Sequence, residues 1–135
     1  MFKVVTILNA ASGAPQYEYA SANYGKTYKK GTLLYCNAGN LQNCTATDKP
    51  THICMSDLKE AGLNEVITVI PITPDLVIET QTERSGSNYD IGSKYALLIK
   101  DGFAVGIDFV TSNGVATIHQ NDIAPGRKRV RVRFV

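Results

Sequence analysis

Short runs of apolar and β-branched residues alternate with turn residues along almost the whole chain. Runs of about 4–8 such residues, bounded by Gly, Asn, Asp or Pro, are typical of β-strands. The predicted strands cover residues 2–8, 32–36, 41–45, 51–55, 65–72, 76–82, 94–100, 103–110, 114–119 and 128–135. About ten short strands at this spacing predict an all-β fold, packed as a small barrel or a sandwich.

Two turns and one helical signal refine this prediction. Asp101-Gly102 and Asn113-Gly114 separate apolar runs and predict tight hairpin turns, because these residue types tolerate the positive φ angles that such turns need. Asp57 is a suitable helix N-cap, and Gly62 a suitable stop. Together they predict one short helical turn near Asp57–Ala61 that connects two strands.

The two halves of the chain repeat one pattern. Each half contains a hairpin, a third strand that ends in an acidic turn, and a long closing strand. The repetition predicts a first meander over residues 31–82 and a second over residues 92–135. Two such meanders would bury one common core, so we expect a single all-β domain over residues 1–135.

Residues 15–28 form a different kind of segment, with four of the seven tyrosines and few aliphatic residues. Tyrosine combines a large apolar ring with a polar hydroxyl, and it is enriched at protein interfaces. The segment is either an arm that contacts another subunit or a partner, or a loop packed over its own domain. The candidate interface residues are Tyr17, Tyr19, Tyr24 and Tyr28.

The last predicted strand alternates arginines with apolar residues. Successive strand residues point to opposite faces, so Arg129, Arg131 and Arg133 share one face while the residues between them pack on the core. The arginine face either protects a strand edge through solvation or docks on an acidic protein surface. No aromatic residue lies between these arginines, which argues against single-strand nucleic-acid binding.

The composition of the 135-residue chain is that of a globular protein, with 44% hydrophobic and 19% charged residues. The net charge is +2, but five of the 14 basic residues lie in the last nine positions, which leaves nine basic and 12 acidic residues elsewhere. This mildly acidic body argues against a protein that coats nucleic acid. No apolar run is long enough for a membrane span or a signal peptide, so we expect neither a membrane protein nor a secreted precursor.

The chain contains three cysteines, Cys36, Cys44 and Cys54. Their odd number and the lack of C-x-x-C spacing predict free thiols in a chain made in a reducing cytoplasm. The alternative is a zinc site that adds His52 to the three thiolates. Structural zinc ligands usually come in close pairs, and only His52 and Cys54 form one, so we expect no bound metal.

No combination of residues in the sequence predicts catalysis. Gly25-Lys26-Thr27 lacks the earlier glycine of a phosphate-binding loop, since residue 20 is alanine. His52 and His119 lie in predicted strands and have no orienting partner in the sequence. Three carboxylates follow one another at intervals of four residues, namely Asp75, Glu79 and Glu83. In a strand they would share one face, and a solvent-exposed face explains this pattern without any catalytic role. We therefore expect no enzyme, and no catalytic or cofactor-binding residue.

Three stretches of the chain carry a further pattern of strands and turns. They are Met1-Phe-Lys-Val-Val with Lys29-Lys-Gly-Thr-Leu-Leu, Ala46-Thr-Asp-Lys-Pro-Thr-His-Ile-Cys-Met-Ser with Val66-Ile-Thr-Val-Ile-Pro-Ile-Thr-Pro-Asp-Leu-Val-Ile-Glu-Thr, and Lys128-Arg-Val-Arg-Val-Arg-Phe. Together they span most of the chain. In these stretches the chain resembles the small β-rich decoration or cement-type proteins of phage heads.

The resemblance implies a non-enzymatic virion structural protein, made in the cytoplasm of the bacterial host, that binds the outer capsid surface without a cofactor. Its expected partners are the major capsid protein and further copies of itself, often as a trimer at a symmetry axis. The alternative is a carbohydrate- or cell-surface-binding β module. Such a module would use exposed tyrosines, since the chain has no tryptophan.

Overall fold

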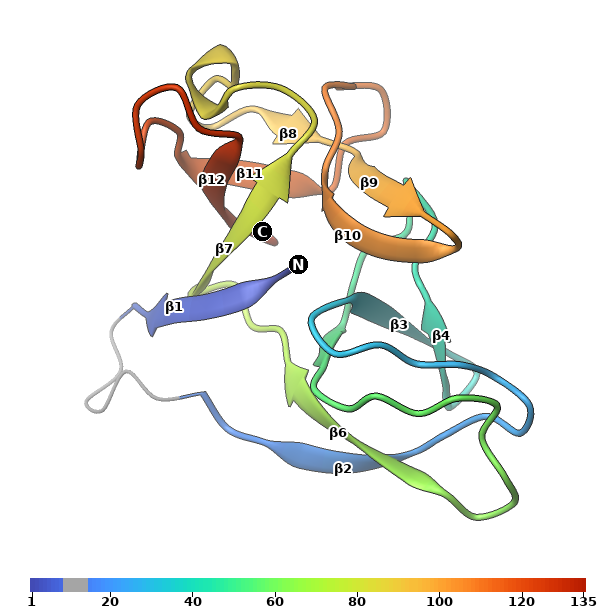
Figure 1. Cartoon of the computed structure of the whole chain (residues 1–135). Helices are drawn as coiled ribbons and strands as arrows, with labels where there is room; N and C mark the ends of the chain where they lie inside the picture. The colour runs from blue at the N-terminus through green and yellow to red at the C-terminus, as the bar shows by residue number, and fades with distance from the viewer. Residues whose placement is uncertain (9–14) are drawn as a thin grey trace.

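Alternating apolar residues and tight turns fold the described part of the chain into twelve short strands, and the all-β prediction is confirmed. The computed structural model describes residues 1–8 and 15–135 (Figure 1). Within these ranges, one 3-10 turn lies at Gly86–Asn88. The strands are β1 (Lys3–Ile7), β2 (Glu18–Ser21), β3 (Leu33–Asn37), β4 (Asn40–Asn43), β5 (His52–Cys54), β6 (Val66–Pro71), β7 (Leu76–Thr82), β8 (Lys94–Tyr95), β9 (Leu97–Lys100), β10 (Phe103–Ile107), β11 (Ala116–Gln120) and β12 (Arg129–Arg133).

Six strands form a nearly closed barrel in the order β8-β11-β12-β7-β10-β9. Only Ala96 separates β8 from β9 in the chain, so the two ends of this order meet. The strand β7 holds the barrel together, because β12 pairs along one of its edges while β1 and β10 share the other. Figure 1 shows β7 between β12 and β10, with β1 beside its first half.

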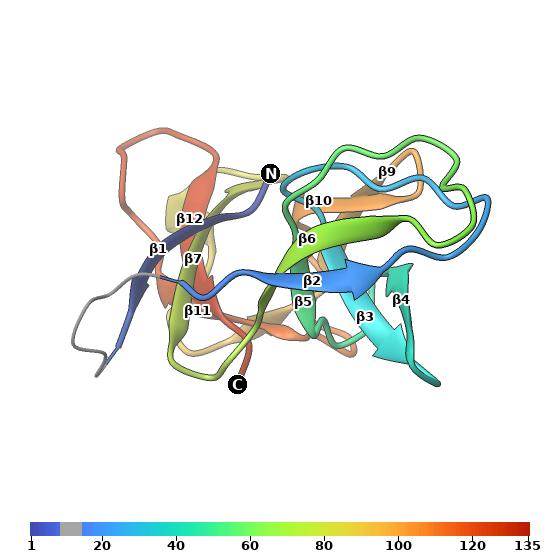
Figure 2. The same cartoon turned by 90° about the horizontal axis from the view of Figure 1, so that it is seen from below.

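The other five strands form an antiparallel sheet in the order β2-β6-β5-β3-β4. Figure 2 shows β2 and β6 side by side, and these two strands form one edge of the sheet. Among the described residues, β4 forms no ladder with β2, and β4 is hydrogen-bonded to the segment 22–28 instead. The Asn43 side-chain amide donates to the Thr27 carbonyl (3.0 Å), and the Tyr28 hydroxyl donates to the Leu41 carbonyl (3.0 Å).

Both sheets use the same strand order. The five-stranded sheet reads β2-β6-β5-β3-β4, and the barrel reads β7-β12-β11-β8/β9-β10, so β8 and β9 together take the place of β3. The barrel closes because β10 also pairs with β7, in parallel. This contact requires Gly106, since a Cβ there would lie 2.5 Å from the Gln81 carbonyl oxygen. The strand β7 lies within the range 31–82 but pairs with the strands of the second half.

One apolar core joins the two sheets. It contains Leu33, Ile53 and Ile70 from the five-stranded sheet together with Ile78 and Ile107 from the barrel. A second cluster lies on the other face of the five-stranded sheet, under the segment 22–28. Strand alternation explains this division, because each of β3, β5 and β6 sends neighbouring residues to opposite faces.

The helical turn predicted near Asp57–Ala61 is wrong. Leu58 instead forms a β-bridge with Tyr28, with N–H···O distances of 2.8 and 2.9 Å in the two directions. The Asp57 carboxylate accepts the Lys30 N–H (2.9 Å) and so caps no helix. Glu60 has a φ of +48°, outside the helical region. A single helical turn is unstable by itself, so pairing with a distant segment prevails here.

Candidate interaction surfaces

The structure separates the four candidate tyrosines into two groups. Tyr17, Tyr19 and Tyr24 are 57%, 81% and 72% exposed. Tyr28 is only 1% exposed and packs in the second core cluster. The prediction that Tyr28 belongs to an exposed interface is therefore wrong, because its ring fills the core of the five-stranded sheet.

Two exposed aliphatic residues lie with the exposed tyrosines. Tyr19 on β2 is opposite Thr68, and Ser21 is opposite Val66, so Tyr19 and Val66 lie on the same face of the β2–β6 pair. The loops that carry Tyr24 and Leu63 are hydrogen-bonded to each other, through the Gly25 N–H and the Ala61 carbonyl (2.7 Å). Both loops extend from the end of the β2–β6 pair at which Ser21 is opposite Val66. We call the exposed side chains of this strand pair and its flanking segments the tyrosine face, and its members are Tyr17, Tyr19, Tyr24, Leu63 and Val66.

An apolar cleft of about 530 Å³ adjoins the tyrosine face. It lies where β1 approaches β5 and β6, and its lining includes Phe2, Ile53 and Ile70. Tyr17 contributes to the same lining, whereas Lys3 and Lys30 bring two cations to it. The cleft therefore extends the tyrosine face toward the barrel and offers apolar surface with charged groups nearby.

The arginine strand is not a sheet edge. β12 pairs with β11 on one side and β7 on the other, so protection of a free edge does not explain its arginines. Arg129 and Arg131 both contact the Glu79 carboxylate, at 3.0 and 3.4 Å. The Arg133 Nε donates to the Pro74 carbonyl (2.8 Å). The arginines are thus partly held by their own barrel and remain half-exposed.

A basic hollow of about 570 Å³ lies on the outside of the barrel, and the sequence did not point to it. A neighbouring hollow of about 310 Å³ shares Gln81 and Lys100 with it and adds Lys29. We call the two hollows together the basic groove. Its cations come from three separate places in the chain, and they are Lys29, Lys100, Arg127, Lys128 and Arg129.

The three cysteines are free thiols, as predicted, and only Cys36 is exposed. Cys44 packs in the core shared by the sheets, whereas Cys54 packs in the second cluster, so the proposed zinc ligands are not brought together. Burial, and to a lesser extent Asp48, raises the pKa of Cys44 to about 12. Among residues 1–8 and 15–135, no three His, Cys, Asp or Glu side chains are grouped so that they could hold a metal ion.

The histidine and carboxylate candidates each lie in a separate setting. The His52 Nδ1 lies 2.8 Å from the Thr51 hydroxyl, and burial lowers the pKa of His52 despite the nearby Glu18. Glu79 contacts two arginines, and Glu83 contacts Arg84 at 3.4 Å. Neither carboxylate is paired with a second acid or a histidine in these contacts, so the geometry offers no acid–base pair at them.

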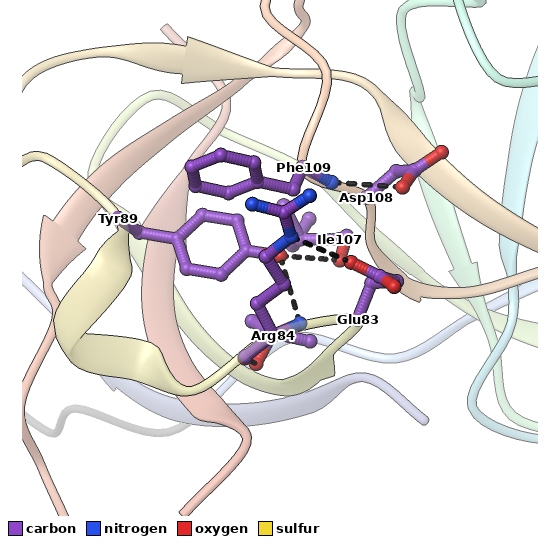
Figure 3. A network of polar contacts seen from close by, with 7 residues as sticks. Glu83, Arg84, Tyr89, Ile107, Asp108 and Phe109 are labelled. Carbon is purple, nitrogen blue, oxygen red and sulfur yellow. Dashed lines mark hydrogen bonds and ion pairs between the residues drawn. The ribbon is translucent and has the colours of Figure 1, made fainter.

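Figure 3 shows a polar and aromatic network between the residues that follow β7 and those at the end of β10. The Arg84 guanidinium lies 4.2 Å from the centroid of the Phe109 ring, and the Tyr89 ring meets Phe109 edge-on. The Tyr89 hydroxyl donates to the Ile107 carbonyl (3.2 Å) and accepts a hydrogen bond from the backbone N–H of Arg84 (3.4 Å). Burial raises the pKa of this hydroxyl. The ring contact and these hydrogen bonds connect the chain after β7 to the chain after β10, which indicates a structural role.

Comparisons with known proteins add no relative. No protein-family model matches the chain, and no curated protein is significantly similar to it. None of the helices in the described residues has the length and apolar character needed to cross a membrane.

Proposed function

We propose that this chain is a non-enzymatic structural protein of a phage virion, which binds and stabilises the outer surface of the capsid. The proposal combines the sequence resemblance to head decoration proteins with the surfaces described above. Its partners are the major capsid protein and further copies of the chain, with a trimer as the expected assembly. The mechanism is adhesion, in which the symmetry of the capsid multiplies weak contacts.

The tyrosine face is the observation that carries this proposal. Tyr19, Tyr24 and Leu63 are each more than 70% exposed, although burying large apolar side chains away from water is favourable. Tyrosine rings suit an interface because they bring large apolar area with few rotatable bonds, and their hydroxyls retain a hydrogen bond in a wet contact. A capsid surface that covers this face would bury these side chains together.

The test mixes the purified protein with capsids of its parent phage that lack it, and counts bound copies after sedimentation. We expect saturation at a stoichiometry that matches a symmetry axis of the lattice. The double variant Tyr19→Ser with Tyr24→Ser should lower occupancy. The matched control Ile91→Ser, which changes an exposed apolar residue outside the face, should not. No sedimentation of the folded wild-type protein with capsids would overturn the proposal.

A carbohydrate- or cell-surface-binding module is the second candidate. It is supported by Tyr17, which is exposed and also borders the cleft of about 530 Å³, because sugar rings pack on aromatic side chains beside a cavity. Lys3 and Lys30 in the lining could donate hydrogen bonds to hydroxyl groups. A glycan screen distinguishes the two candidates, since capsid binding through the tyrosine face predicts no specific glycan.

A further inference from the structure

The basic groove lies over the part of the barrel wall where β10 closes onto β7. Gly106 on β10 is paired with Gln81 on β7 and with Leu98 on β9, and both of these partners line the groove. Residues directly opposite each other in a sheet point to the same face, so Gly106 faces the groove without adding a side chain to it. The other lining residues come from the end of β7, from β9 and from the segment that leads into β12, and Figure 1 shows how these strands are arranged.

The charges around this hollow are mostly uncompensated. Among the described residues, Lys100, Arg127 and Lys128 take part in no ion pair, whereas Glu83 is already engaged by Arg84. Lys29 lies over the Phe103 ring at 4.6 Å in the adjoining hollow. The positive field extends to the Met1 amino group, whose pKa is lowered by burial and then by the charges of Arg129 and Lys100.

The lining therefore favours an anion, and its polar centre favours a peptide. Five cations face two acids, Glu83 and Asp101, across the two hollows. Gln81 lies in both hollows, and its amide can both donate to and accept from a peptide backbone, whereas a phosphate only accepts. The exposed tyrosines that could stack on nucleic-acid bases belong to the other sheet.

We infer that the basic groove binds an extended, acidic peptide segment of the protein to which this chain attaches. The inference deepens the proposed function and rests on it, because it names the chemistry of the contacted segment. Aspartate and glutamate side chains would pair with Lys100, Lys128 and Arg127 along the hollow, while the segment's backbone contacts Gln81. Charge pairing of this kind mainly sets the association rate and the choice of partner, and it weakens with salt.

Fluorescence anisotropy with a labelled oligoglutamate peptide and the full chain tests this inference. We expect saturable binding that weakens as salt is raised. The double variant Lys100→Glu with Lys128→Glu should bind at least about tenfold more weakly. Lys94→Glu is the matched control, because Lys94 is an exposed lysine on β8 of the same barrel that does not line the groove, and it should bind like the wild type.

Three outcomes would overturn the inference. They are no binding of the peptide at low salt, an equal loss in the Lys94→Glu control, or tighter binding of an oligothymidylate of equal length. The neutral variant Lys100→Gln with Lys128→Gln, checked by circular dichroism, separates lost charge from lost fold. Peptide binding without capsid sedimentation would refute the proposed function alone. Capsid sedimentation of the wild type and of both groove double variants, with no peptide binding, would refute the peptide-binding role of the groove alone.

Discussion

Replacing Tyr28 by phenylalanine should destabilise the protein, although the residue stands among tyrosines that are free in solvent. The Tyr28 hydroxyl donates to the Leu41 carbonyl (3.0 Å) and accepts the Asn23 N–H (2.9 Å), in a side chain that is 1% exposed. Phenylalanine keeps the ring and its apolar burial. It removes both hydrogen bonds and leaves the partly buried Asn23 N–H without its acceptor.

The expected cost follows from these two bonds. An intramolecular hydrogen bond contributes about 0.5–1.5 kcal/mol, and an orphaned buried polar group costs about 1–3 kcal/mol. The Leu41 carbonyl keeps the Asn23 side-chain amide at 3.4 Å, which limits the loss. We therefore expect the free energy of unfolding to fall by about 1–3 kcal/mol in Tyr28→Phe, measured by urea denaturation.

Tyr24→Phe is the matched control, because Tyr24 is 72% exposed. Its free energy of unfolding should stay within about 0.5 kcal/mol of the wild type. If Tyr28→Phe also stayed within this range, the two hydrogen bonds of the hydroxyl would not be stabilising the segment 22–28 against β4, and this reasoning would be refuted.

Three further predictions concern titration and backbone contact. Because the folded chain holds the Cys44 proton more tightly, with a pKa of about 12 against 9.0, the free energy of unfolding should fall as the pH rises between these values, by about 1 kcal/mol per pH unit. Cys44→Ala should flatten that slope in urea denaturation across pH, and an unchanged slope would contradict the prediction. Because the pKa of His52 is lowered in the fold, stability should fall as the pH drops below 6.5, and His52→Gln should remove this part of the acid dependence. Gly106→Ala should cost about 1–3 kcal/mol, since the new Cβ meets the Gln81 carbonyl oxygen, and an unchanged thermal midpoint would refute the close approach.

The sequence predicted the fold class because strand signals are local. Alternating apolar residues and tight turns depend on neighbours within a few positions, and Asp101-Gly102 forms the predicted β9–β10 hairpin, with φ angles of 53° and 85°. The hairpin predicted at Asn113-Gly114 is wrong: Asn113 has a positive φ (54°), but the flanking strands β10 and β11 pair with other strands of the barrel and not with each other. The helical turn near Asp57–Ala61 failed as well. Its local N-cap signal competed with pairing to residues about thirty positions earlier, which periodicity does not reveal.

For the candidate sites, too, the sequence predicted local features and missed those that depend on distant segments. Spacing indicated correctly that Arg129, Arg131 and Arg133 share a face, but it could not show that β12 lies inside the barrel. The basic groove was missed because its cations come from distant segments. One signal was present in Gly106, since a glycine inside a strand run marks a bulge or a close approach of another chain segment.

The shared strand order has different consequences at the two proposed binding surfaces. In the barrel, β10 reaches β7 and closes the wall at Gly106, and the hollow that cations surround lies over this closure. In the five-stranded sheet, the corresponding strand β4 forms no ladder with β2 among the described residues, and the segment 22–28 that is hydrogen-bonded to β4 carries the exposed Tyr24.

Because one core joins the sheets, a partner that binds one surface also brings the other close to it. Two linked contacts can exceed the affinity of either by about a hundredfold or more. Salt screens exposed charges but strengthens apolar burial only slightly, so the two contributions separate with ionic strength. In capsid binding, the tyrosine-face variant should therefore keep a steep salt dependence, whereas the groove variant should lose it.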